Sequence, residues 1–299
     1  MQFLKNILRN IIPLNLRKKL LPAKYKKYEA KPFERRFITI EDVIAGKSFQ
    51  MYLREDSFME HTFLEHGLYR NWEKESLKIW AELSKQADVI IDMGANTGVF
   101  SMLAQNNNSN ATVVAIEPVD INYSVLSKNI AQNNFPVKAE KVALSNEEGT
   151  AKMFMLRDRL NYMTSVNDNR YALHPEIKGN DDVVEIEVPI KPFESIFNKY
   201  NLQKIDLIKI DVEGHEIAVL NSMMHFLEKF KPVILIEIIG DENAEQLTVM
   251  FNNLGYKYIS INEETTSVVV DKLWDNDHHN FLLCHAETIQ YLQQKGLVA

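Results

Sequence analysis

Apolar positions along this chain change their spacing several times, and the changes predict alternating strands and helices. From residue 89 onward, short runs rich in Val, Ile and Leu alternate with stretches of helical periodicity. The runs predict strands at 89–94, 112–118, 138–145, 205–212, 232–239 and 256–262, with shorter pieces around 267–272 and 280–285. Helices are predicted at 98–106, 120–133, 193–200, 215–229 and 241–254. This alternation predicts a mostly parallel, doubly wound α/β sheet with helices on both faces.

Two stretches depart from the alternation. Residues 146–190 contain two strand-like runs, GTAKMFML and VVEIEVPI, around a long polar and aromatic loop. We interpret 146–190 as an inserted segment on the substrate side, the alternative being a disordered loop. Residues 37–85 end in the helix-like run NWEKESLKIWAEL, which we expect to pack beside the ligand crevice. We treat 37–299 as one domain.

The first 36 residues carry eleven Lys and Arg but only two acids, although the whole chain has a formal net charge of −7. The body is therefore strongly acidic, which argues against nucleic acid as a partner. Within this extension, FLKNILRNIIP spaces its apolar residues helically and is too short to span a membrane. A basic amphipathic helix lying on an anionic membrane surface is one interpretation, and a helix packed on the body or on a partner is the other.

The chain has a single cysteine, Cys284, among its 299 residues. One cysteine excludes an internal disulfide framework and fits a reducing compartment. We therefore predict a cytoplasmic protein, with peripheral contact at the inner membrane face if the N-terminal extension binds lipid.

The first predicted strand runs directly into a turn of small residues, in the stretch VIIDMGANTGVF at 89–100. Gly94 and Gly98 allow the backbone to turn and to approach a ligand closely. Their spacing, G-x-N-x-G, differs from the dinucleotide pattern G-x-G-x-x-G. Asp92 would repel a pyrophosphate and would favour a cationic ligand such as S-adenosylmethionine. A strand-to-helix turn that binds no ligand is the alternative.

The next strand ends in AIEP, which places Glu117 where it could accept hydrogen bonds from two ribose hydroxyls. Asp120 is the competing acid, but we expect it to cap the following helix. The third strand ends in VALS, where Ala143 and Ser145 could border an adenine ring or simply end the strand.

A second polar cluster follows the strand in IDLIKIDVEGHEIAVL. Asp211, Glu213 and His215 stand two residues apart where the strand ends, and Gly214 permits the turn. Acids and an imidazole at such a point could orient or deprotonate a substrate hydroxyl. Alternatively, an acid caps the following helix and His215 faces solvent. No metal site is predicted, because the HExxH pattern is missing its second histidine and His278 and His279 are only loop neighbours.

Five blocks, in this order and spacing, resemble the FkbM-type methyltransferases: DMGANTGVFS, AIEP, VALSNEEGT, IDLIKIDVEGHEIAVL and PVILIEI. The resemblance covers roughly residues 65–285. It implies a class I, Rossmann-like sheet of seven strands with the last strand antiparallel. It also implies S-adenosylmethionine as cofactor, held by Asp92, Gly94, Ala95, Asn96, Gly98 and Glu117, with Ala143 nearby. Upstream, GLYRNWEKE, which contains Glu73, resembles the segment with which the family covers the methionine end of the cofactor.

Family members mostly methylate hydroxyl oxygens of sugars and natural products. We therefore expect a hydroxylated small molecule or glycan as acceptor. Asp211 or His215 would take the hydroxyl proton and Glu213 would position the acceptor. A methyltransferase acting on protein or nucleic-acid nitrogen is disfavoured, because Asp-Val-Glu-Gly replaces the Asn/Asp-Pro-Pro-aromatic turn typical of such enzymes. A nicotinamide oxidoreductase would need the other glycine spacing. A non-catalytic cofactor-binding module on the same fold is a further alternative.

Overall fold

The computed structural model describes residues 35–55, 57–156, 183–276 and 278–299. The predicted amphipathic N-terminal extension, its membrane contact and the loop at 157–182 therefore lie outside the described residues. None of the helices in the described ranges is long and apolar enough to cross a membrane.

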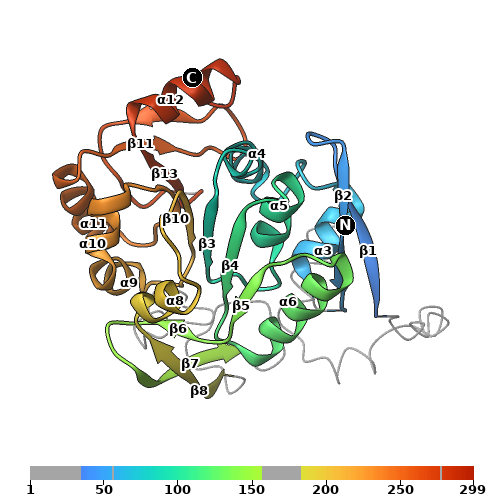
Figure 1. Cartoon of the computed structure of the whole chain (residues 1–299). Helices are drawn as coiled ribbons and strands as arrows, with labels where there is room; N and C mark the ends of the chain where they lie inside the picture. Colours follow the sequence, from blue (N-terminus) through green and yellow to red (C-terminus); the bar gives the residue numbers. More distant parts are fainter. Residues whose placement is uncertain (1–34, 56, 157–182, 277) are drawn as a thin grey trace, which may run out of the picture. The chain divides into compact units, whose positions relative to one another are not determined.

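An eight-stranded sheet forms the centre of the fold (Figure 1). Its strands, in spatial order, are β12 (Val268–Val270), β11 (Lys257–Ser260), β13 (Asn280–Cys284), β10 (Val233–Glu237), β9 (Leu207–Ile210), β3 (Val89–Met93), β4 (Thr112–Ile116) and β5 (Lys138–Glu140). The five strands from β10 to β5 are parallel, whereas β13 runs antiparallel to both of its neighbours. The predicted doubly wound sheet with an antiparallel last strand is confirmed, and β12 adds an eighth strand at one edge.

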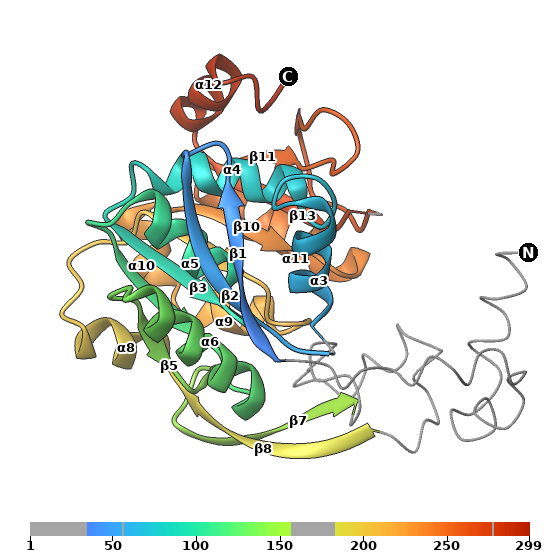
Figure 2. The ribbon, with the colours of Figure 1, turned by 90° about the vertical axis from the view of Figure 1, so that its right-hand side faces the viewer.

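Helices cover both faces of this sheet (Figures 1 and 2). One face carries α4 (Lys74–Ser84), α5 (Val99–Asn107) and α6 (Asp120–Asn133), and the other carries α8 (Phe193–Lys199), α9 (Glu216–Ser222), α10 (Met224–Phe230) and α11 (Asp241–Asn253). Odd-numbered residues of β3 pack into the core beneath α8 to α11. Every residue of β3 is buried, and its sequence is therefore apolar at each position except Asp92, without the apolar–polar alternation of a half-exposed strand.

Several elements were not predicted. The segment before α4 contains a hairpin of β1 (Arg36–Asp42) and β2 (Lys47–Leu53), followed by α3 (Phe58–His66). The hairpin packs against α5 and α6, and α3 packs against the hairpin. A final helix, α12 (Ala286–Gln294), contacts α4 through a hydrogen bond from Tyr291 to Glu82.

Two predicted elements are each divided in the structure. The predicted strand 138–145 becomes β5 and β6 (Ala143–Leu144), and β6 leaves the central sheet to pair with β8 (Val183–Lys191). Antiparallel β7 (Gly149–Leu156) completes that smaller sheet. The predicted helix 215–229 becomes α9 and α10, because Met223 between them has φ −117° and ψ 15°, outside the helical region. Tertiary pairing and a local backbone break therefore override continuous sequence patterns.

The start of α4 is held by a residue distant in sequence. The Glu263 carboxylate, in the loop between β11 and β12, accepts hydrogen bonds from the backbone N–H groups of Glu75 and Ser76 at 2.7 and 3.2 Å. It also accepts one from the Ser76 hydroxyl at 2.5 Å. A carboxylate at this position satisfies amides that have no partner inside the helix and complements the helix dipole.

We expect Glu263→Gln to destabilise the chain by about 1 kcal/mol and to lower its melting temperature by roughly 2–4 °C, because a charged helix cap is lost. Thermal unfolding at neutral pH measures this. Glu264→Gln is the matched control, because it removes the charge of the adjacent, exposed acid and leaves the Glu263 carboxylate in place. Equal melting temperatures for the two variants would contradict the capping role.

A second close contact joins the ends of β3 and β9. A Cβ atom added to Gly94, which has a φ of +79°, would lie 1.8 Å from the backbone oxygen of Asp211. Only glycine permits both this conformation and this approach. The turn after β3 and the turn after β9 are therefore in backbone contact.

We predict that Gly94→Ala destabilises the chain by about 3 kcal/mol or more, since overpacking adds to the strain of a positive φ. Gly255→Ala is a matched control: its φ is +77°, but nothing lies within 4 Å of the added Cβ. That control should lose only about 1–2 kcal/mol. Thermal and denaturant unfolding of both variants compare the two costs, and similar losses would show that the contact with Asp211 is unimportant.

Candidate functional site

One pocket gathers nine of the ten predicted site residues. It lies where β3, β4 and β9 end, and its lining includes Asp92, Gly94, Ala95, Asn96, Glu117, Ala143, Asp211, Glu213 and His215. Parallel strands bring their carboxyl ends to one edge of a sheet, which explains why residues far apart in the sequence meet here.

The exception is Gly98, which does not line the pocket. It precedes α5 with a φ of +96°, and a Cβ at this position would lie 2.5 Å from the Leu126 side chain of α6. Gly98 therefore allows close packing of α5 against α6 beneath the turn, rather than offering a surface to a ligand.

The turn after β3 presents one buried acid and one unusual asparagine. Asp92 is 1% exposed and accepts a hydrogen bond from the Ser101 hydroxyl at 2.5 Å. Burial raises the pKa of Asp92 to about 6, although Ser101 and Lys209 oppose the shift. Asn96 has a φ of +51°, and its side-chain Oδ1 is buried without a hydrogen-bond partner in the described structure. An unpaired buried acceptor of this kind is costly unless a ligand uses it.

Glu117 is linked directly to that turn. Its carboxylate accepts hydrogen bonds from the backbone N–H groups of Asn96, at 2.9 Å, and Val119, at 2.8 Å. Burial raises the pKa of Glu117 to about 7 against these hydrogen bonds. Since an ionised carboxylate can accept about four hydrogen bonds, capacity remains for ligand hydroxyls. The prediction that Asp120 caps α6 was wrong: Asp120 is the first residue of the helix, and its carboxylate pairs with Lys141.

Apolar side chains form the wall beyond Glu117. Ala143 lies in β6 with Val142 and Leu144 on either side, and Ile116 at the end of β4 also lines the pocket. From the smaller sheet, Met153 of β7 reaches the same lining. This wall suits a flat, weakly polar group, whereas the opposite end of the pocket is acidic.

The turn after β9 carries the proposed acids and the imidazole. Glu213 and Gly214 have φ values of +60° and +90°, which direct the chain sharply from β9 into α9. Glu216 supplies the carboxylate that accepts the Gly214 backbone N–H, at 2.9 Å. Burial lowers the pKa of His215, so its imidazole is neutral at neutral pH. A neutral imidazole can accept a proton.

A row of charged side chains crosses the sheet on the face covered by α4 and α5. Asp92 on β3 is in register with Lys209 on β9, and Asp211 follows two residues later on the same face. The Lys209 Nζ atom lies 3.3 Å from the Asp211 Oδ2 atom. Glu237 ends β10, one position beyond the pair of Ile236 and Ile210. The row thus consists of three acids, Asp92, Asp211 and Glu237, around the single buried ammonium of Lys209.

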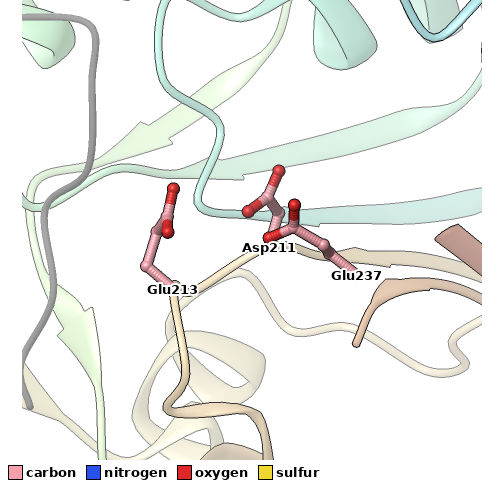
Figure 3. Close-up of side chains that lie close together, drawn as sticks. All are labelled: Asp211, Glu213 and Glu237. Atoms are coloured by element: carbon pink, nitrogen blue, oxygen red, sulfur yellow. The ribbon is translucent and has the colours of Figure 1, made fainter. Parts of the chain in front are cut away.

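Asp211, Glu213 and Glu237 also form a cluster of three carboxylates. Figure 3 shows Asp211 and Glu237 side by side at neighbouring strand ends, with Glu213 on the turn that follows. One ligand atom from each lies within 4.8 Å of the others. Carboxylate oxygens are the ligands that Mg²⁺ and Ca²⁺ prefer, so a divalent cation, if one binds within the described residues, has suitable donors here.

Sequence reasoning missed several of the residues in this pocket. Lys209 lies inside an apolar strand and Glu237 ends another, and both positions are recognisable because charge is rare in buried strands. Met59 lines the pocket from α3, which was not predicted, whereas Trp72 and its neighbour Glu73 lie in GLYRNWEKE, the upstream segment that resembles the family's cofactor-covering segment. Glu73, with a φ of +43°, places its carboxyl near Lys209 and Asp211, and burial raises the pKa of that carboxyl to about 7.

The donors and charges in this pocket fit S-adenosylmethionine. Among the described lining residues, the acids Asp92, Glu117, Asp211 and Glu213 outnumber the one ammonium, Lys209, which favours a cationic ligand. Glu117 and the unpaired Asn96 oxygen offer acceptors for hydroxyl groups, and the wall around Ala143 is apolar enough for a purine. These features would hold the sugar and base at one end and the positively charged amino acid at the other.

Comparison with known proteins supports this assignment. The sequence matches the Methyltransferase FkbM domain family over residues 92–258, more than half of the chain. Among curated relatives, it is 30% identical over 154 residues to Methyltransferase sdnD of Sordaria araneosa, covering 45% of this chain and 60% of that protein. The chain thus spans less than two thirds of that relative's length.

Two further relatives match over more of their length. The 31-O-demethyl-FK506 methyltransferase FkbM of Streptomyces tacrolimicus is 26% identical, over 61% of this chain and 71% of that protein. The hexuronic acid methyltransferase AglP of Haloferax volcanii is 24% identical, over 60% and 68%. Among solved structures, an FkbM methyltransferase from Methylobacillus flagellatus aligns with a TM-score of 0.41 and 14% identity, covering 66% of this chain and 43% of that one.

The matched residues begin at Asp92 and extend past Glu237, and thus contain both turns that build the pocket. The chain belongs to the FkbM family of methyltransferases, which have the class I fold and use S-adenosylmethionine as methyl donor.

Proposed function

We propose that this protein transfers a methyl group from S-adenosylmethionine to a hydroxyl oxygen of a sugar, a glycan or a small natural product. The observation that carries the proposal is the placement of Asp211, Glu213 and His215 in one pocket with the turn after β3. The names of two relatives support the acceptor class, because one acts on a 31-O-demethyl compound and the other on a hexuronic acid.

In this proposal the turn after β3 and the end of β4 hold the cofactor. Asp92, Gly94, Ala95 and Asn96 contact it from the turn, Glu117 accepts hydrogen bonds from its ribose, and Ala143 borders its base. Gly98 supports the turn from beneath through its packing on Leu126. When bound, the cofactor supplies an electrophilic methyl group, and the protein supplies alignment and electrostatics.

The turn after β9 would prepare the acceptor. A hydroxyl oxygen is a poor nucleophile until its proton leaves, so a base within hydrogen-bond reach is useful. Asp211 or His215 takes that proton in our proposal, and Glu213 orients the acceptor. All three are half-buried and line the pocket, so solvent and ligand can both reach them.

The proposed catalytic domain spans residues 37–299, with 146–190 on the substrate side. Within that segment, Met153 of β7 lines the pocket, on the apolar wall that we assign to the base of the cofactor. Residues 1–36 are proposed as a separate extension that could bring the protein to an anionic membrane surface.

A base variant should separate the candidate residues. The base is either Asp211 or His215, so one of the variants Asp211→Asn and His215→Asn should lower kcat by about 10²–10⁴-fold. Proton removal by a positioned base contributes about this much to the rate. Turnover at saturating cofactor, with folding checked by circular dichroism, measures the effect. Glu213→Gln should instead raise KM for the acceptor. The control is Asp120→Asn, since this acid is exposed at the start of α6 and does not line the pocket. Undiminished turnover in all three site variants would contradict the assignment.

Cofactor binding should depend on pH. Because the pKa values of Asp92 and Glu117 are raised to about 6 and about 7, both carboxyls become protonated as the pH falls through this range. A cationic ligand with hydroxyl donors prefers the ionised forms, so its affinity should fall about tenfold per pH unit between about pH 7 and pH 6, and more steeply below about pH 6. Calorimetry with S-adenosylmethionine between about pH 5 and pH 8 measures this. In Glu117→Gln the affinity should be weaker and its pH dependence shallower, whereas a flat profile in the unmodified chain would contradict the roles of both acids.

The acceptor class has its own test. A methyl-transfer screen with isotopically labelled S-adenosylmethionine would compare glycans and small alcohols with peptides and nucleic acids. Labelled methyl on a hydroxyl oxygen supports the proposal, and labelled methyl on nitrogen would support the rival methyltransferase. Cofactor binding without transfer to any of these acceptors would favour a non-catalytic module.

A further inference from the structure

Lys209 is a lysine buried in the middle of a parallel strand. Its side chain is only 2% exposed, and it lies between Ile208 and Ile210 in a strand whose residues are all buried. Burying an ammonium is costly unless nearby groups compensate for the lost water. The strand therefore contains a charge that the fold alone would not favour.

Four acids from four different segments compensate for that charge. Asp92 lies in register with Lys209 on β3, Asp211 follows it on β9, Glu237 ends β10, and Glu73 precedes α4. Burial alone would lower the pKa of Lys209, but attraction to Asp211, Glu73, Glu237 and Asp92 outweighs it and raises that pKa. Lys209 is therefore charged at neutral pH.

The ammonium contacts the acid that we assign to catalysis. Its Nζ atom lies 3.3 Å from Oδ2 of Asp211. On another side, the ring centroid of Phe100 lies 5.1 Å away, an arrangement in which a cation is attracted to the ring face. Phe100 of α5 and strand β9 restrict the movement of the Lys209 ammonium. The ammonium therefore holds the Asp211 carboxylate in a defined position.

Lys209 also lines the pocket, which a purely internal ion pair would not do. Among the described lining residues it is the only lysine or arginine. Its position between the turn after β3 and the turn after β9 connects the two halves of the site.

We propose that Lys209 is a positioning residue, which holds one oxygen of the Asp211 carboxylate and leaves the other oxygen directed at the acceptor. The inference rests on the proposed function, because it assumes that Asp211 acts on the acceptor. Balancing the surrounding acids is a second role of the same ammonium, and the two roles predict different effects of substitution.

The test uses Lys209→Met, which preserves the length of the side chain, together with the charge-balanced double variant Lys209→Met/Glu237→Gln. In the ligand-free chain the single variant should lower the melting temperature, because acids lose their counter-charge. Because the double variant also removes one acid, it should recover part of the lost melting temperature. At saturating cofactor, however, the double variant should keep a kcat about 10²-fold below that of the unmodified chain, with the KM for S-adenosylmethionine little changed, since Asp211 is still not held.

Two further variants complete the design. Lys209→Arg keeps a donor beside Asp211 and should recover part of the turnover that Lys209→Met loses. Lys204→Met removes an exposed lysine that pairs with Asp88 and Asp206 near the other end of β9, and it should leave turnover unchanged. If Lys209→Met alone does not fold, the double variant is compared with Glu237→Gln.

The proposal is overturned if Lys209→Met turns over like the unmodified chain, or if the double variant regains both stability and turnover. The second result would make Lys209 only a structural counter-charge. Failure of the proposed function appears differently: the unmodified chain would transfer no methyl group to a hydroxyl, while the melting temperatures of the ligand-free variants would still report on charge balance.

Discussion

The parallel pairing of β3 with β9 is the contact on which the rest of the site depends. It sets Asp92 opposite Lys209 and brings the turns after both strands together, until Gly94 meets the Asp211 backbone. One turn is assigned to the cofactor and the other to the acceptor. Methyl transfer requires donor and acceptor in line, so a fixed backbone contact between the turns defines the geometry before either ligand binds.

Burial determines the electrostatics of this region. Asp92, Glu117 and Glu73 all have raised pKa values, because the sheet and its helices exclude water from them. A carboxyl whose pKa is higher in the folded chain than in the unfolded chain stabilises the folded state when it is protonated. This stabilisation is complete below the unfolded pKa and is lost as the pH rises through the folded pKa. Stability of the ligand-free chain therefore decreases between roughly pH 4 and pH 7 on account of these groups, and a cationic ligand would reverse that decrease. The buried acids therefore lower the stability of the ligand-free chain at neutral pH, and the same ionised acids favour a cationic ligand.

Much of this arrangement could be read from the sequence, because its local signals agree with one another. Apolar runs, small-residue turns and acids at strand ends indicated the strands of the parallel sheet, both turns and ten site residues, nine of which line the pocket. What could not be read depends on tertiary pairing. The run 138–145 looks like one strand, but Ala143 and Leu144 pair with β8 in another sheet. Gly98 has the signature of a ligand-binding glycine, yet what requires it is the Leu126 side chain of α6.

The cap that Glu263 places on α4 has a consequence for how the family core is used. Residues 92–258 contain both site turns, but Trp72 and Met59, which also line the pocket, come from before that core. The helix that follows Trp72 is held from after the core, by Glu263. The shared core thus supplies both turns, whereas part of the pocket wall comes from the segment before it, and a residue after the core holds the start of α4 in that segment. A relative that alters the segment before the core would therefore need a compatible residue at the position of Glu263 to keep the start of α4 capped.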